Sequence, residues 1–227
     1  MTIDTDALAA LGDNWMVRTD NDGEGYRGFR WAPVGEWTEC PKWSDKTTAD
    51  CESGGLFGQG PGGYGHAQSG TRFVFCETGP ERMAVKGDKV KVRRARILHV
   101  GADALEALAV VTGGNFPGSL DLRGCTLPEG LALPQTVAGS LDLSACTLPE
   151  GLALPQTVDG SLNLSDCTLP EGLALPQTVG GSLYLCDCTL PEGLALPQTV
   201  GGSLNRSDCT LPEGLALPQT VGGRIYR

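Results

Sequence analysis

The chain has 227 residues and a mass of 23.7 kDa, which is enough for one large domain or two small ones with a buried core. Hydrophobic residues make up 40% of it, which excludes wholesale disorder, and no apolar run approaches the roughly 20 residues of a membrane-spanning helix. The formal net charge of −10 argues against nucleic acid as a partner.

The first residues carry Asp4 and Asp6 but no Lys or Arg, so we expect no signal peptide. This start predicts a cytoplasmic protein whose nine cysteines stay reduced, and the odd number of cysteines agrees with that expectation. Residues 4–11 predict a short helix with Asp4 or Thr5 as its cap.

Residues 1–114 contain all four tryptophans and no internal repeat, and they predict a small α+β domain. Three segments rich in β-branched and aromatic residues predict strands, at 25–32, 71–77 and 89–100. Between them, residues 51–70 contain eight glycines and predict a loop. A second helix is expected at about 102–111, where it can cap the first turn of the repeats that follow.

Three motifs of this half, YRGFRW, CESGGL and KVKVRRARIL, lie within residues 26–98. Together they resemble a small domain of unknown function that occurs in phage and bacterial proteins, often joined to repeat arrays. The resemblance implies a bacterial host and indicates domain boundaries, but it implies no catalytic role and no cofactor.

Four residues of the N-terminal half have side chains that can bind zinc: Cys40, Cys51, His66 and Cys76. Their spacings of 11, 15 and 10 residues match no familiar zinc motif. A glycine-rich loop with few core residues is nevertheless a place where a metal would add stability. We favour the simpler interpretation, which is buried thiols and a surface histidine.

Arg27 is the candidate for catalysis. The tripeptide YRG, followed by a β-rich stretch and a glycine-rich loop, resembles ADP-ribosyltransferases, in which the first strand supplies an arginine to NAD. The resemblance implies a nucleotide-binding enzyme whose loop at 51–70 closes over the nucleotide. The Glu-x-Glu motif of many such enzymes is absent around Glu77 and Glu81. We therefore favour Arg27 as a solvent-facing strand residue.

Basic residues are concentrated between positions 82 and 96, where seven of the 17 lie. Such a cluster can attract phosphates, but Val90 and Val92 alternate with the charges as in a half-buried strand. We expect these side chains to pair with neighbouring acidic residues.

From Pro117 onward the sequence repeats every 21 residues. The 13-residue string CTLPEGLALPQTV occurs five times unchanged, starting at Cys125, Cys146, Cys167, Cys188 and Cys209, and the chain ends within a sixth unit. A fixed period of this length predicts a solenoid. The L-x-L pair of each unit has strand periodicity, so residues 115–227 predict a right-handed parallel β-solenoid. The half with two prolines predicts extended chain with Leu148, Leu152 and Leu154 pointing inward.

The pattern L-x-L-x-x-C-x-L-P resembles a short, glycine-rich leucine-rich repeat of bacterial and phage proteins. The resemblance implies that the cysteines stack as the buried ladder that turns the chain out of each strand. A parallel β-helix is the main structural alternative. Zinc ligands usually come in C-x-x-C pairs, which this column lacks, so we interpret it as buried apolar thiols.

Variation between the repeats is concentrated at and around the strand. One exposed column is expected to contain Asp121, Asp142, Asn163, Tyr184, Asn205 and Tyr226. A stacked sheet with mixed Asp, Asn and Tyr side chains suits protein recognition. We therefore predict a non-enzymatic module that binds a protein partner through this face. A phage structural component that self-associates through the solenoid ends is an alternative, because exposed strand edges can pair with another copy.

The repeats are also strongly acidic. From Gly118 onward there are eleven acidic residues and four arginines, a net charge of −7. Stacking brings the glutamate of every repeat into one column, which can attract a cation or a basic partner. Solubility is the simplest explanation of this column.

Overall fold

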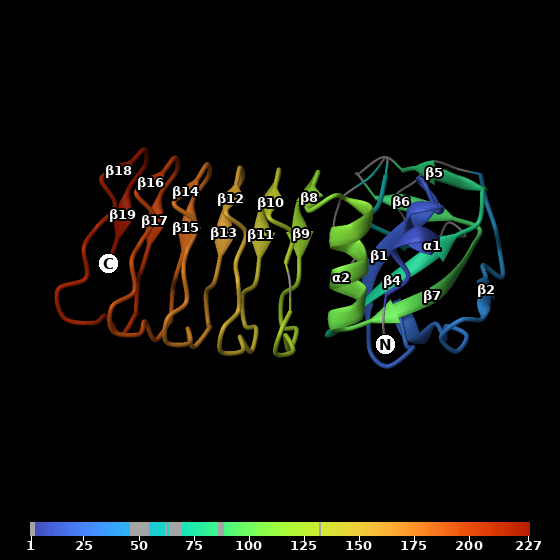
Figure 1. Ribbon diagram of the computed structural model, residues 1–227, viewed down its shortest axis with the longest axis horizontal. Coiled ribbons are helices and arrows are strands. Elements are labelled where there is room, and N and C mark those ends of the chain that lie inside the picture. Colours follow the sequence, from blue (N-terminus) through green and yellow to red (C-terminus); the bar gives the residue numbers. More distant parts are fainter. Residues whose placement is uncertain (1–2, 46–54, 62, 64–69, 86–88, 132) are drawn as a thin grey trace. The chain divides into compact units, whose positions relative to one another are not determined.

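The computed structural model describes residues 3–45, 55–61, 63, 70–85, 89–131 and 133–227 (Figure 1). The chain divides into two compact units, Met1–Val111 and Thr112–Arg227. The first is an α+β unit, and the second is a parallel β-solenoid with a 21-residue period. No helix among the described residues is both long and apolar enough to cross a membrane.

The described N-terminal unit contains two antiparallel sheets. The larger has the order β1-β4-β7-β2, with β1 at Trp15–Asp20, β4 at Arg72–Thr78, β7 at Arg94–Val100 and β2 at Trp37–Glu39. The smaller has the order β3-β6-β5, with β3 at Leu56–Gly58, β6 at Val90–Val92 and β5 at Arg82–Ala84. A bridge between Val17 and Gln59 joins the two sheets.

One buried core is shared by both sheets. Met16, Val74 and Ile97 come from the larger sheet, while Leu56 and Val92 come from the smaller one. Helix α2 (Ala102–Val111) packs on β4, β7 and the short helix α1 (Thr5–Ala9), and it buries apolar residues of its own on that side. Both helices were predicted, and α1 is capped as expected, since Asp4 Oδ1 accepts a hydrogen bond from the Ala7 N–H at 3.0 Å.

The sequence prediction was wrong at two segments of this unit. Residues 25–32 do not form a strand, because Tyr26–Gly28 is a 3-10 turn in which Arg27 has φ +57°. The segment 51–70 is not entirely a loop, because it contains β3. Gly58 belongs in that strand because a Cβ there would lie 2.8 Å from Met16 Sδ and from the Val17 carbonyl oxygen, so only glycine lets the two sheets approach.

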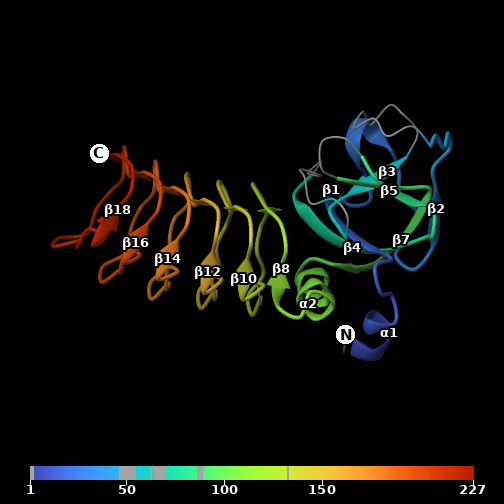
Figure 2. The same cartoon turned by 90° about the horizontal axis from the view of Figure 1, so that it is seen from above.

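The described part of the solenoid forms two parallel sheets of six strands each. Within a sheet the strands follow one another in sequence order, as Figure 2 shows for β8 to β18. The strands of one sheet are β8 (Asn115–Phe116), β10 (Thr136–Val137), β12 (Thr157–Val158), β14 (Thr178–Val179), β16 (Thr199–Val200) and β18 (Thr220–Val221). Those of the other are β9 (Leu120–Asp121), β11 (Leu141–Asp142), β13 (Leu162–Asn163), β15 (Leu183–Tyr184), β17 (Leu204–Asn205) and β19 (Ile225–Tyr226). The L-x-L pairs predicted the second sheet, whereas the first was not foreseen.

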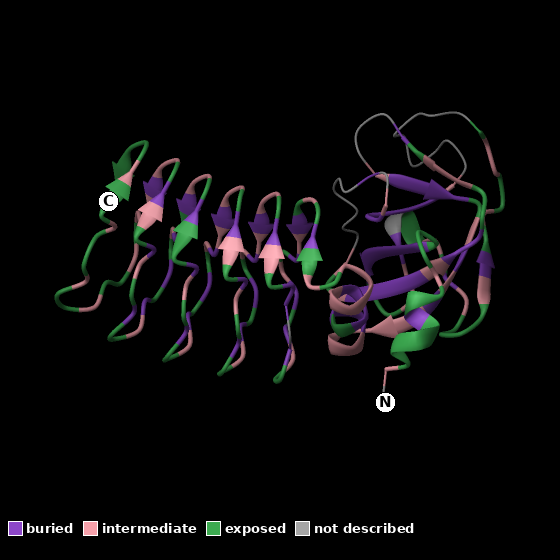
Figure 3. Cartoon of the chain, turned by 45° about the horizontal axis from the view of Figure 1, so that its top comes forward, coloured by how far each residue is buried: buried purple, intermediate pink, exposed green. Residues whose placement is uncertain are grey.

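Inward-pointing columns of Val, Leu and Cys fill the solenoid. Leu148 is 8% exposed and Leu152 is 5% exposed, as predicted, while Leu154 is half-buried. The last turn is far more open, since Leu211 and Leu217 are 39% and 41% exposed (Figure 3). The core of the solenoid therefore lies in its inner turns.

Serine and glycine form the corner between the two sheets. The Ser140 N–H donates to Ser119 Oγ at 3.0 Å, and the same bond recurs one, two and three turns later. The neighbouring position requires glycine, because a Cβ on Gly181 would lie 2.6 Å from Ser161 Oγ. A polar ladder thus runs along this corner, and successive backbones approach closely there.

Candidate functional site

The variable strand face is defined here as the column Asp121, Asp142, Asn163, Tyr184, Asn205 and Tyr226. The parallel register pairs each of these residues with its equivalent in the next turn, from β9 to β19. The six residues predicted from the sequence therefore share one column of one sheet. Their burial differs, since the Asp and Asn residues are half-buried whereas Tyr184 is 37% exposed and Tyr226 is 44% exposed.

Most carboxylate and amide oxygens of this face hold their own turn in place. Asn163 Oδ1 accepts hydrogen bonds from the Ser165 N–H at 3.1 Å and from its hydroxyl at 2.8 Å. Asp142 with Ser144 and Asn205 with Ser207 repeat this arrangement. These side chains are therefore fixed before any partner arrives.

The first turn uses an arginine in place of the serine. Arg123 forms an ion pair with Asp121 at 2.8 Å and lies 3.7 Å from Asp142 Oδ2 in the next turn. The hydrogen bond to Asp121 raises the pKa of the Arg123 guanidinium, so this arginine stays charged. That cation pairs with Asp121 and lies close to Asp142, so both carboxylates are engaged within the face. The middle of the face is more accessible because Tyr184 is exposed there.

Asn163, Tyr184 and Asn205 lie in three consecutive turns and form that middle part. Within the described part of the chain, the amide Nδ2 groups of both asparagines and the Tyr184 hydroxyl have no hydrogen-bond partner. An exposed aromatic ring is thus flanked by two amide donors whose oxygens are already engaged. The arrangement can receive a partner's acceptor groups around an apolar contact.

The cysteine column forms a second ladder inside the solenoid. The Cys146 thiol donates to the Leu122 carbonyl oxygen of the previous turn at 3.0 Å, and Cys167, Cys188 and Cys209 repeat the contact. Burial raises the pKa of both Cys146 and Cys188 to about 12, so these thiols are protonated at neutral pH. Protonated, buried thiols are poor nucleophiles and poor metal ligands. Cys186, two residues after Tyr184, is half-buried.

The four predicted zinc ligands are only partly described. Cys51 and His66 lie outside the described residues. Cys40 is half-buried against the N-terminal core, and Cys76 is a fully buried member of it, with a pKa that burial raises to about 12. Among the residues that the structure describes, no group of three or more His, Cys, Asp or Glu side chains could hold a metal ion.

Arg27 does not have the position that the enzyme hypothesis requires. It lies exposed on the 3-10 turn, whereas the resemblance to ADP-ribosyltransferases implies an arginine on the first strand. The expected pairing of the basic stretch with acids is confirmed for three of its arginines. Arg96 forms an ion pair with Glu77 at 2.6 Å, Arg93 lies 3.8 Å from Glu81, and Arg94 lies 4.0 Å from Glu39.

Sequence reasoning missed a buried lysine and a groove. Lys91 in β6 has no exposed surface, and its Nζ lies 5.3 Å from the centre of the Trp43 ring. Desolvation lowers the pKa of this lysine. The groove lies between two turns of the solenoid, in the segment that every repeat shares, and sequence identity alone gives no signal for it.

Comparison of the chain with protein-family models, with curated proteins and with solved structures finds no match. The geometry of the solenoid is therefore the basis for the function proposed below.

Proposed function

We propose that this protein is a non-enzymatic interaction module that binds a protein partner through the variable strand face. The observation that carries the proposal is the group formed by Asn163, Tyr184 and Asn205 on three paired strands. Tyrosine is enriched at protein interfaces because its ring supplies apolar area and its hydroxyl supplies a polar tip. A bacterial or phage setting, which rests on the resemblances noted in the sequence, and a cytoplasmic location are parts of the same proposal.

Rigidity supports the proposal. The two asparagines are held by their own serines, and the strands on which they lie are paired on both sides. Binding immobilises flexible side chains at about 0.5–1.5 kcal/mol each, and a surface whose side chains are already ordered avoids most of that cost. The face thus presents fixed donors around one exposed ring.

A site-specific photocrosslink tests this proposal. Tyr184 is replaced by a photoreactive phenylalanine analogue in the full chain, and the protein is irradiated in a bacterial lysate. We expect a discrete crosslinked protein, whose yield falls at least fivefold when Asn163→Ala and Asn205→Ala are added. The matched control places the same analogue at Thr168, which is exposed on a different side of the preceding turn. Equal crosslinking from positions 184 and 168 would refute the proposal.

A further inference from the structure

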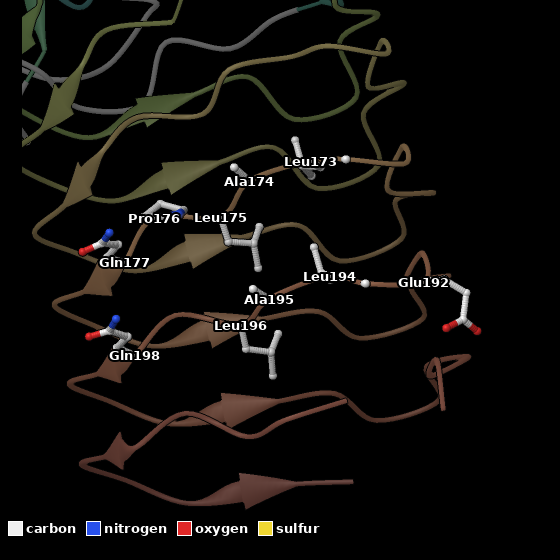
Figure 4. Close-up of a pocket in the computed structure, with 12 residues that line it drawn as sticks. Leu173, Ala174, Leu175, Pro176, Gln177, Glu192, Leu194, Ala195, Leu196 and Gln198 are labelled. Atoms are coloured by element: carbon white, nitrogen blue, oxygen red, sulfur yellow. The ribbon is translucent and has the colours of Figure 1, made fainter. Parts of the chain in front are cut away.

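A groove lies between two consecutive turns of the solenoid, on the side that contains the invariant sequence EGLALPQ. Its volume is about 410 Å³, and its walls are residues 172–177 of one turn and residues 192–196 and Gln198 of the next (Figure 4). Leu173 and Leu194 are buried at its base, while Leu175 and Leu196 are half-buried along it. The groove therefore combines leucine side chains with polar atoms of its walls.

The backbone between the two walls is unpaired. Within the described part of the chain, the N–H and C=O groups of Ala174, Leu175, Ala195 and Leu196 have no hydrogen-bond partner. The ladder between the same two turns is closed on either side of this gap. Gln198 N–H donates to the Gln177 carbonyl oxygen at 2.8 Å, and Thr168 bridges to Thr189. The groove thus offers free main-chain donors and acceptors, which an extended peptide can match.

The charge at the groove is of one sign. Glu192 is exposed at one end, opposite Gln177 and Gln198 at the other, as Figure 4 shows. The invariant repeat contains no Lys, Arg or His, so the neighbouring turns add further glutamates to this side and no cation. All four arginines of the solenoid lie in the variable segments. A groove with leucine side chains and an acidic border is complementary to a peptide that carries both apolar and basic side chains.

We propose that this groove binds an extended, cationic segment of a partner protein, in which Lys or Arg alternates with an apolar residue. In an extended chain, alternate side chains point to opposite sides. The apolar set contacts Leu175 and Leu196, the basic set reaches Glu192, and the main chain bonds to Ala174 or Ala195. The proposal is independent of the variable strand face, since it uses residues that no repeat varies.

The test is fluorescence anisotropy of the full chain with a labelled decapeptide of alternating Leu and Lys. Every repeat carries the same glutamate, so the variant replaces all five by glutamine, at Glu129, Glu150, Glu171, Glu192 and Glu213. The matched control removes the same charge elsewhere, with Asn at Asp142, Asp159, Asp166, Asp187 and Asp208. Circular dichroism of both variants checks that they keep the fold. We expect at least a tenfold loss of affinity in the glutamate variant and less than a threefold loss in the aspartate control.

A second variant separates the groove from general electrostatics. Ala195 is exposed, so Ala195→Trp fills the groove without disturbing the core, and we expect it to lower the number of peptides bound per chain. A decapeptide of alternating Leu and Glu should not bind. Equal losses in the two charge variants, an unchanged stoichiometry in Ala195→Trp, or equal binding of the Leu-Glu peptide would each overturn the proposal.

Discussion

In the N-terminal unit, residues that share a core lie far apart in the sequence, as Met16 and Ile97 do. In the solenoid, each strand pairs with the strand 21 residues away, as Leu141 pairs with Leu162. Long-range pairing must close large loops before any contact is gained, whereas a repeat gains its contacts from its neighbours. A defect in the first unit therefore affects its whole core, while a defect in the solenoid affects chiefly the adjoining turns.

The two units can be followed separately in one experiment. All four tryptophans lie in the first 43 residues, so tryptophan fluorescence reports on the N-terminal unit alone. Far-UV circular dichroism reports on both units. A change in the dichroism transition without a change in the fluorescence transition therefore belongs to the solenoid.

The largest effect is expected from a charge in an inner turn. Leu164 is fully buried, and Leu164→Arg should destabilise the solenoid by about 3–5 kcal/mol, because the new guanidinium loses its hydration without gaining a partner. Urea unfolding followed by dichroism measures the loss, and fluorescence should not change. The control is Ser165→Arg, one residue further along on the outward side. If the two variants lose equal stability, the Leu164 column is not the core of the solenoid.

A methyl group at the corner of the solenoid should have the next largest effect. Gly181→Ala should cost about 2–3 kcal/mol, because its Cβ would lie 2.6 Å from Ser161 Oγ and successive turns would have to separate. Gly193→Ala provides the comparison, since this residue has φ +75° but no atom within 4 Å of a Cβ. It should cost about 1 kcal/mol, from the backbone conformation alone. Thermal unfolding by dichroism gives both values, and the reverse order would contradict the close packing at this corner.

Much of the difference between the N-terminal unit and the solenoid could be predicted from the sequence. The 21-residue period alone indicates stacked turns, and the register of β11 with β13 follows from it. Helix α2 was also predictable, because residues 102–111 contain no proline or glycine and the helix is preceded by Gly101 and followed by Gly113. The sequence pattern is sufficient to predict structure that is local, such as a helix, or that repeats at a fixed period, such as the solenoid.

Features that depend on the path of the backbone were not predictable. A Thr-Val pair of two residues has no periodicity that would mark it as a strand. β3 was hidden by glycines, which mark loops but here let Lys91 and Met16 pack against the chain. The fixed geometry of the variable strand face has a sequence signal, the recurring Asx-x-Ser of Asp142, Asn163 and Asn205, which predicts a side chain that caps its own turn. The groove has no such signal, because the same invariant string also contains residues that pair between turns, such as Gln177 with Gln198.

A smaller effect of opposite sign is expected in the more open last turns. Arg206 occupies the column of Leu164 and is half-buried, and its Nε is buried without a hydrogen-bond partner among the described residues. Arg206→Leu should therefore stabilise the solenoid by about 1–2 kcal/mol, from apolar burial and the removal of an unpaired donor. Arg227 in the same column is exposed, so Arg227→Leu should change the stability much less. Equal gains at both positions, measured by urea unfolding, would show that burial is not the cause.

The smallest effect separates backbone conformation from packing in the solenoid. Ala145 has φ +54°, a conformation that costs alanine about 1 kcal/mol relative to glycine, and Gly124 occupies the same position one turn earlier. Ala145→Gly should therefore raise the midpoint of the dichroism transition. The same substitution in the same turn, Ala138→Gly, should lower it, because Ala138 is also exposed but has no positive φ, so that glycine there adds only freedom to the unfolded chain. Two exposed alanines that differ in the sign of φ thus predict opposite effects of the same substitution. Effects of the same sign would mean that residue 145 is not held in the left-handed conformation.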